Sequence, residues 1–235
     1  MNRRNPFSNF KKVALTHDTQ IRLDHLEHNH QQIIDELLVR YRRLDQDTVQ
    51  QLNRFLDQPM YNARESNFNC IDELPEILQA PMDQARRLYE SCCHLIEDIH
   101  YTTDDIRELC TLIGLSKSST PEKAGPLGIF IAALVNKCDG SHFEFNCRRH
   151  QRKPNFMGFG LESEKNMVVQ GNLGHFAGAA LNGGELKING AIDSWCAAGM
   201  IKGRITIMSN KPSTPAQKRQ RWFYGIPEDT LEIVR

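Results

Sequence analysis

GNLGHFAGAALNGGELKIN, residues 171–189, is followed without a gap by GAIDSWCAAGMIKGRITIM, residues 190–208. Written one above the other, these two 19-residue stretches place glycines and apolar residues at the same positions. The matched positions include Gly171 with Gly190, Phe176 with Trp195, and Gly184 with Gly203, whereas Asp193 and Ala197 stand opposite the corner glycines Gly174 and Gly178. A fainter copy precedes them, in which Met157, Met167 and Val169 fall one period before Phe176, Leu186 and Ile188.

The repeat predicts a stacked architecture. Within each unit, residues 186–188 and 205–207 alternate apolar and polar side chains, which is typical of a strand with one buried face. A unit this short cannot bury its own apolar face, so it must stack on its neighbours. The glycine-rich segments between strands suit tight corners with positive φ. We therefore expect a short right-handed parallel β-helix of about three 19-residue coils.

The glycine-rich run from 171 to 200 resembles the β-helix in the C-terminal domain of the large chain of glutamate synthase. It is also similar to the glycine-rich β-helical component of formylmethanofuran dehydrogenase. The resemblance covers residues 125–208 and implies a right-handed β-helix that packs against catalytic parts and carries none of the chemistry. The chain begins Met1-Asn2, whereas glutamate synthase uses an N-terminal cysteine, and its cysteines lack iron–sulfur spacing. The resemblance thus implies a scaffold.

The part before the repeat is predicted to be helical. Ile33, Ile34, Leu37, Leu38, Tyr41 and Leu44 recur at three- and four-residue steps, which indicates an amphipathic helix. Asp47 is expected to cap a second helix, Pro81 and Asp83 to open a third, and Thr103 and Gly114 to bound a fourth. Residues 127–138, LGIFIAALVNKC, are apolar on nearly every side, so that helix should be buried between the two halves.

The fold class is accordingly α+β, with a helical domain at 1–124, the β-helix with its preceding buried helix at 125–210, and a tail at 211–235 that packs on the body. Charge supports this division. Residues up to Lys123 carry 15 basic and 20 acidic side chains, and the remainder carries 14 and 9. The formal net charge is therefore zero, which excludes a protein held to nucleic acid by overall charge and makes a nucleic-acid partner improbable.

Targeting and redox signals indicate a cytoplasmic protein. The longest apolar run, 127–135, is shorter than the roughly 20 residues of a spanning helix. The N-terminus lacks the apolar segment of a secretory signal. Seven cysteines at irregular spacing favour reduced thiols over a disulfide framework.

Four residues near the start of the expected β-helix are candidate metal ligands. Cys and His are good zinc ligands, and Cys138, His142, Cys147 and His150 lie close together in sequence. The alternative is structural, because His142–Asn146 has the pattern of a strand with Phe143 and Phe145 inward. No paired C-x-x-C spacing is present. The structural interpretation is favoured, so no cofactor is expected, and zinc is the alternative at these four residues.

Other site patterns point to structure. Gly171, Gly174 and Gly178 have G-x-x-G-x-x-x-G spacing, which is not a dinucleotide-binding fingerprint. No G-x-S-x-G, P-loop or H-E-x-x-H motif occurs. His25, His28 and His30 are expected on a solvated helix face. Trp222, Phe223 and Tyr224 are a candidate partner surface, because aromatic residues concentrate at interfaces.

Two functions remain open. The first is a non-catalytic scaffold or protein-interaction module, such as a structural subunit or regulator of a larger complex, in which helices and a rigid β-helix bind a protein partner. The second is an enzyme or metal-binding protein that uses Cys138, His142, Cys147 and His150, with His175 and Asp193 at facing corners. The absence of enzyme motifs favours the first.

Overall fold

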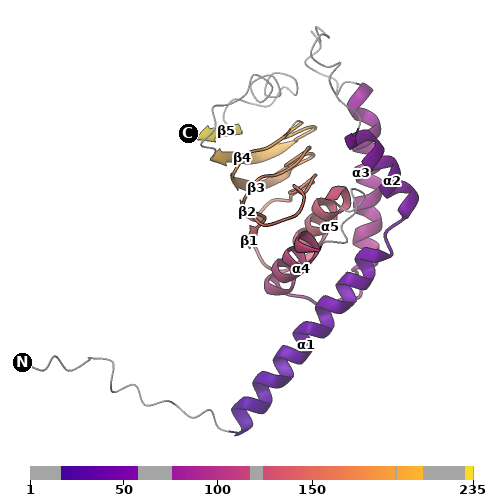
Figure 1. Ribbon diagram of the computed structural model, residues 1–235. Helices are drawn as coiled ribbons and strands as arrows, with labels where there is room; N and C mark the ends of the chain where they lie inside the picture. Colours follow the sequence, from indigo (N-terminus) through magenta and orange to yellow (C-terminus); the bar gives the residue numbers. More distant parts are fainter. Residues whose placement is uncertain (1–16, 58–75, 117–123, 194, 209–230, 235) are drawn as a thin grey trace, which may run out of the picture.

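A computed structural model describes residues 17–57, 76–116, 124–193, 195–208 and 231–234. The fold is α+β, and in the described part all helices precede all strands (Figure 1). The helices are α1 (His17–Arg42), α2 (Gln46–Asp57), α3 (Glu76–Leu95), α4 (Thr103–Leu115) and α5 (Ala124–Lys137). The strands are β1 (His142–Asn146), β2 (Asn166–Gln170), β3 (Asn182–Asn189), β4 (Lys202–Met208) and β5 (Leu231–Val234).

The strands form one parallel sheet in chain order, and the register confirms the predicted period. Met167 lies beside Leu186, and Leu186 lies beside Ile205. All three side chains are buried, as are Phe143 and Phe145 of β1. The neighbouring outward positions are polar or partly exposed, so each strand buries one face as the alternation predicted.

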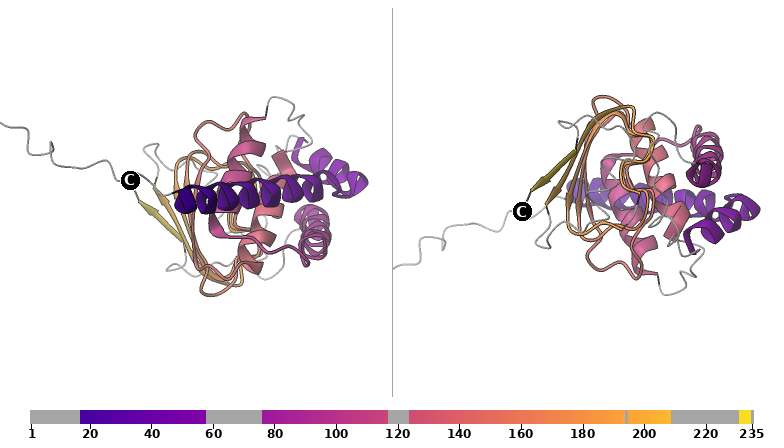
Figure 2. Two further views of the ribbon diagram at one scale, coloured as in Figure 1. Left: turned by 90° about the horizontal axis from the view of Figure 1, so that it is seen from below. Right: turned by 90° about the horizontal axis from the view of Figure 1, so that it is seen from above.

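The segments between strands also pair with one another. The amide of Phe156 donates to the carbonyl of His175, and the amide of Ala180 donates to that of Ala198. Figure 2, which views the stack along its length, shows successive units lying over one another. Phe156 stacks on Phe176 with ring centroids 4.7 Å apart, and both residues have positive φ. The corner equivalent of Phe176 is therefore Phe156 and not Met157, because the earliest unit carries one more residue between its corner and its strand.

Only part of the glycine pattern reflects positive φ. Gly178 has φ +66°, and Ala197, one period later, keeps the same conformation at +61° without being glycine. Gly190 serves a close approach instead, since a Cβ there would lie 2.1 Å from the carbonyl oxygen of Gly171. Gly174 is similar, with the Asn155 side chain 2.0 Å from the Cβ position. Glycine thus lets neighbouring units approach at least as often as it turns the chain.

Helix α5 joins the two halves. Its residues from Leu127 to Val135 are buried, as their composition predicted. Helices α4 and α5 lie against the stacked strands, and α2 and α3 lie farther out (Figure 1). The buried apolar residues form one cluster that runs from Ile34 in α1 to Ile207 in β4. The helical layer and the sheet therefore share a single core.

Several predicted helix boundaries were wrong by a few residues. The cap of α4 is Thr102 and not Thr103, and Thr102 forms a reciprocal capping box with Asp105. Asp45, not Asp47, accepts the first amides of α2. Pro81 lies inside α3, which already begins at Glu76, and Gly114 lies within α4, which ends one residue later. Side-chain caps and an interior proline shift boundaries that composition alone locates only approximately.

His30 links α1 to α4, which the sequence did not predict. Its Nε2 lies 2.7 Å from the Glu108 carboxylate, and its Nδ1 pairs with Asp105. The hydrogen bond to Glu108, followed by that to Asp105, raises the pKa of His30 above its usual 6.5. The protonated imidazole can donate to both carboxylates at once. The side chains of His25 and His28 lie outside the described residues.

Changing His30 to Gln should reduce stability at low pH more than at high pH. Because the folded-state pKa is raised, the stabilisation is complete below about pH 6.5 and is lost as the pH rises through the folded pKa. His30 is about one third exposed, so the effect should stay below about 1 kcal/mol. Urea denaturation at about pH 6 and pH 9 measures it. His94→Gln, at an exposed site 4.0 Å from Glu97, is the control and should leave this pH dependence unchanged.

Candidate functional site

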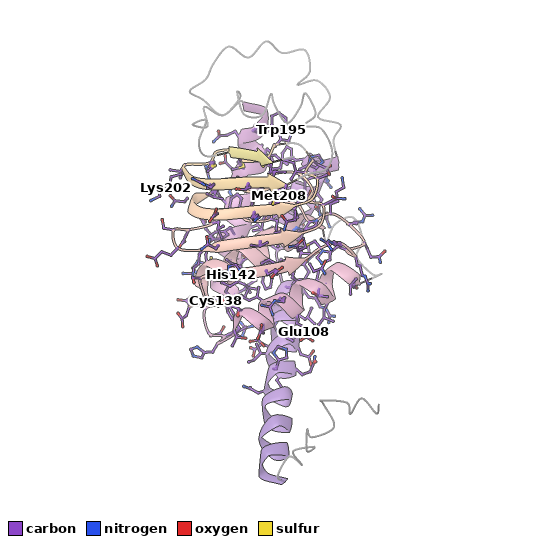
Figure 3. The ribbon with its side chains drawn as sticks, turned by 90° about the vertical axis from the view of Figure 1, so that its left-hand side faces the viewer. Glu108, Cys138, His142, Trp195, Lys202 and Met208 are labelled. Atoms are coloured by element: carbon purple, nitrogen blue, oxygen red, sulfur yellow. The ribbon has the colours of Figure 1, made fainter. Side chains whose placement is uncertain are left out.

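The structure divides the four predicted metal ligands into two pairs. Cys138 and His142 lie at the start of β1 (Figure 3). Cys147 follows the end of that strand, and a five-residue strand spans roughly 16 Å. His142 is exposed, whereas Cys138 is buried at the end of α5. Only Cys147 and His150 are brought together.

Cys110 of α4 completes a cluster with these two residues. The Sγ atoms of Cys110 and Cys147 and a ring nitrogen of His150 all lie within 4.8 Å of one another. We call these three residues the Cys/His cluster. Within the described ranges it is the one group of at least three Cys, His, Asp or Glu side chains close enough to share a metal ion.

Backbone hydrogen bonds hold the turn that carries two members of the cluster. The Cys147 amide donates to the Gln170 carbonyl at 2.7 Å, which ties the turn to the end of β2. The His150 amide donates back to the Cys147 carbonyl at 3.2 Å. The Gln151 amide donates to the carbonyl of Gly114 at 2.9 Å, which ties the turn to α4. The positions of Cys147 and His150 relative to α4 are therefore set by main-chain contacts.

Gly114 makes room for the imidazole of His150. It lies one helical turn after Cys110, on the same face of α4. A Cβ at Gly114 would lie 2.3 Å from Nε2 of His150. Gly114, which the sequence predicted to end this helix, thus allows the His150 ring to lie against α4 beside the Cys110 thiol.

Both cysteines of the cluster are buried, and the ring nitrogens of the half-buried His150 have no hydrogen-bond partner among the described residues. Cys110 and Cys147 are 1% and 4% exposed. Neither ring nitrogen of His150 contacts solvent, and neither has a hydrogen-bond partner among the described residues. Buried polar groups nearly always have partners, so a histidine with two unsatisfied nitrogens requires an explanation.

The two thiols shift each other's pKa in opposite directions. A hydrogen bond from Cys110 lowers the pKa of Cys147 to about 6, and His150 lowers it further, although burial acts in the opposite direction. The same hydrogen bond, together with burial, raises the pKa of Cys110. A thiolate is the form of cysteine that binds metals. The cluster therefore combines a thiol of lowered pKa with a second thiol and an imidazole.

A hollow of about 280 Å³ opens beside the cluster. Cys147 and His150 form part of its wall, and basic and amide side chains form most of the remainder. We call it the basic hollow; its lining residues are Cys147, Arg148, His150, Arg152, Lys153, Gly171, Asn172 and Asn189.

His175 and Asp193 do lie near each other, as predicted for facing corners. Asp193 forms a 2.7 Å ion pair with Lys153, two units earlier in the chain. Burial lowers the pKa of His175, while Asp193 raises it and Lys153 lowers it. Lys153, His175 and Asp193 come from three successive units, and Lys153 also lines the basic hollow.

Cys110 is the member of the Cys/His cluster that sequence reasoning missed. It lies 37 positions before Cys147 and fits the apolar stripe of α4 with Ile106, Leu109 and Ile113. The only signal was Gly114 one turn later, which leaves space on the Cys110 face. Trp222, Phe223 and Tyr224 lie outside the described residues.

No protein-family model matches the chain, and no curated protein or solved structure is significantly similar to it. The resemblance to the glutamate synthase β-helix therefore remains a prediction. Across the described ranges, none of the helices has the length and apolar character needed to span a bilayer. The six described cysteines form no disulfide with one another.

Proposed function

We propose that this protein binds a zinc ion through Cys110, Cys147 and His150. The observation that carries the proposal is the imidazole of the half-buried His150. Its two nitrogens are shielded from solvent and have no hydrogen-bond partner among the described residues, while two cysteine sulfurs lie within 4.8 Å. A metal bound to one of these nitrogens would satisfy it. Zinc suits the donors best, because thiolate and imidazole are its usual ligands.

The spacing of the cluster is compatible with one ion. In a tetrahedral zinc site, with Zn–S bonds of about 2.3 Å, two sulfurs lie about 3.8 Å apart. The separations of up to 4.8 Å would contract slightly around the ion. Three protein ligands leave a fourth position for water or substrate, which is typical of catalytic rather than structural zinc. The basic hollow adjoins Cys147 and His150 and provides room on that side.

Zinc titration of chelator-treated protein tests this function. We expect one zinc per chain, and we expect Cys147→Ser, Cys110→Ala and His150→Ala each to weaken binding by more than about 100-fold. Loss of a residue that merely orients a ligand costs 10- to 100-fold, so loss of a ligand should cost more. Competition with a chelating dye measures the affinity.

Cys138→Ser is the matched control, because Cys138 is a buried cysteine outside the cluster. It should leave zinc affinity unchanged. Cobalt(II) bound to the unmodified protein provides a second readout that needs no variant, since thiolate ligands give it charge-transfer absorption. Absence of that absorption, or equal losses in the Cys138 and Cys147 variants, would refute the proposal.

A scaffold role is the second candidate. The pairing of both strands and corners at a 19-residue period supports the view that residues 125–208 form a right-handed β-helix. We propose that this body, with the helices packed on it, presents a surface to a protein partner and holds the zinc site rigidly. Co-purification of a stoichiometric partner from the native cell would support this role, and repeated recovery of the protein alone would contradict it.

A further inference from the structure

We propose that the basic hollow binds a small phosphate-bearing molecule next to the zinc site. The inference rests on the proposed zinc function for its chemistry, but the groups of the hollow that would bind the anion are not zinc ligands. Three cationic side chains, Arg148, Arg152 and Lys153, line it. The wall contains no carboxylate.

The positive charge is only partly neutralised. Lys153 pairs with Asp193, and one nitrogen of Arg148 donates to the Gln170 side chain at 3.1 Å. Arg152 forms no ion pair within the described part of the chain. Arginine offers several N–H groups in a planar fork that matches two oxygens of a phosphate. The hollow therefore has unused donors for an anion.

Amide groups supply further donors. Asn172 uses its Oδ1 to accept the Ala191 amide at 2.9 Å, which leaves its NH₂ group available. Asn189 has a buried side-chain oxygen without a partner among the described residues. Because the oxygen and nitrogen of an amide can be exchanged by a flip, Asn189 can present N–H groups instead. Donors from several directions suit a tetrahedral anion better than a flat carboxylate.

Size and charge restrict the ligand further. About 280 Å³ is at the lower end of small-molecule sites, so the ligand is a phosphate or a short phosphate ester. Zinc bound by two thiolates and a neutral imidazole has a net charge of zero. The zinc-loaded cluster would therefore not weaken the attraction between the arginines and an anion in the hollow. A phosphate oxygen can also take the fourth zinc position. That arrangement is suited to hydrolysis or transfer of a phosphate ester.

Calorimetric titration of the zinc-loaded full chain with inorganic phosphate tests the proposal. Arg152→Gln should weaken phosphate binding about tenfold or more, because a charge-assisted hydrogen bond is lost. Its zinc affinity should be unchanged. Arg149→Gln is the matched control, since Arg149 is an exposed neighbour that does not line the hollow. Phosphate affinity should be unchanged in that variant.

The outcomes separate the two proposals. Equal weakening by both arginine variants would mean a diffuse surface attraction and would overturn the phosphate site. Tighter binding of acetate than of phosphate, or no phosphate binding by the zinc-loaded protein, would also overturn it. If zinc fails to bind but phosphate binds and depends on Arg152, the phosphate site stands and the zinc function falls.

Discussion

Replacing Gly128 with alanine is expected to destabilise the protein by about 3 kcal/mol or more. In an exposed helix the same change would stabilise by up to about 1 kcal/mol, because alanine is the better helix former. At Gly128, however, the added Cβ would lie 1.9 Å from the Asn155 carbonyl oxygen and 2.6 Å from the Met157 amide. These are backbone atoms, so no side-chain rotation can relieve the overlap.

The corner that Gly128 contacts cannot easily move. The Phe156 amide donates to the His175 carbonyl, and the Met157 carbonyl accepts the Gly178 amide. Displacing the corner would break these bonds to the next unit, or would separate α5 from the sheet. Helix α5 is thus docked directly on the main chain.

Chemical denaturation of Gly128→Ala and of Gly160→Ala measures the effect. Gly160 has φ +59° and a Cβ there would contact nothing within 4 Å. Replacing Gly160 with alanine should lower the free energy of unfolding by only about 1–2 kcal/mol, because alanine is strained in the left-handed backbone conformation. If Gly128→Ala proved no more costly than Gly160→Ala, the close packing of α5 on the corner would be wrong.

Replacing Asn136 with leucine should cost about 3 kcal/mol. Asn136 is 9% exposed in an otherwise apolar helix. Its Nδ2 donates to the Tyr89 hydroxyl at 2.8 Å and to the Gly160 carbonyl at 2.9 Å, and its Oδ1 accepts the Glu162 amide at 3.2 Å. Leucine keeps the volume but leaves these partly buried partners unsatisfied.

Tyr89→Phe is the matched control, because it removes one of the three bonds and little volume. It should cost about 1 kcal/mol. Equilibrium unfolding in denaturant measures the free energy of unfolding of each variant. The two losses can be compared directly when the slope of that free energy with denaturant concentration is the same. Equal losses would mean that Asn136 does not connect α3, α5 and the corner at Gly160 as the contacts indicate.

The repeat could be predicted from sequence because each inward strand position must be apolar, and this requirement alone decides which residues occur there. Leu186 and Ile205 must be apolar to face the core, so their period is visible without a structure. The corner of the earliest unit was misaligned by one residue, because its extra residue leaves no apolar signal. Helix caps were misplaced for a similar reason, since Thr102 and Thr103 are both good caps and only the capping box with Asp105 distinguishes them.

The candidate site was half predictable. Cys147 and His150 are three residues apart, and a turn brings them together, so their spacing was informative. Cys110 comes from a helix 37 positions earlier, and only the packing of α4 against the turn places it beside them. Asn136 also gave no signal, because a polar residue in an apolar helix becomes meaningful only when its partners are known. Contacts between distant segments are not encoded in local patterns.

The offset between neighbouring strands indicates where the gene for this half can change in length. Met167 faces Leu186 and Leu186 faces Ile205, each 19 positions on, whereas the offset is 24 from β1 to β2 and 26 from β4 to β5. The offsets of 19 and 24 both keep the inward side chains inward, because extra residues are accommodated in the connections and not in the paired strands. A single-residue insertion inside a strand, by contrast, would turn the side chains beyond it to the other face. Lineages that carry this architecture should therefore differ in the lengths of the connections or by whole units, and the strands themselves should keep their lengths.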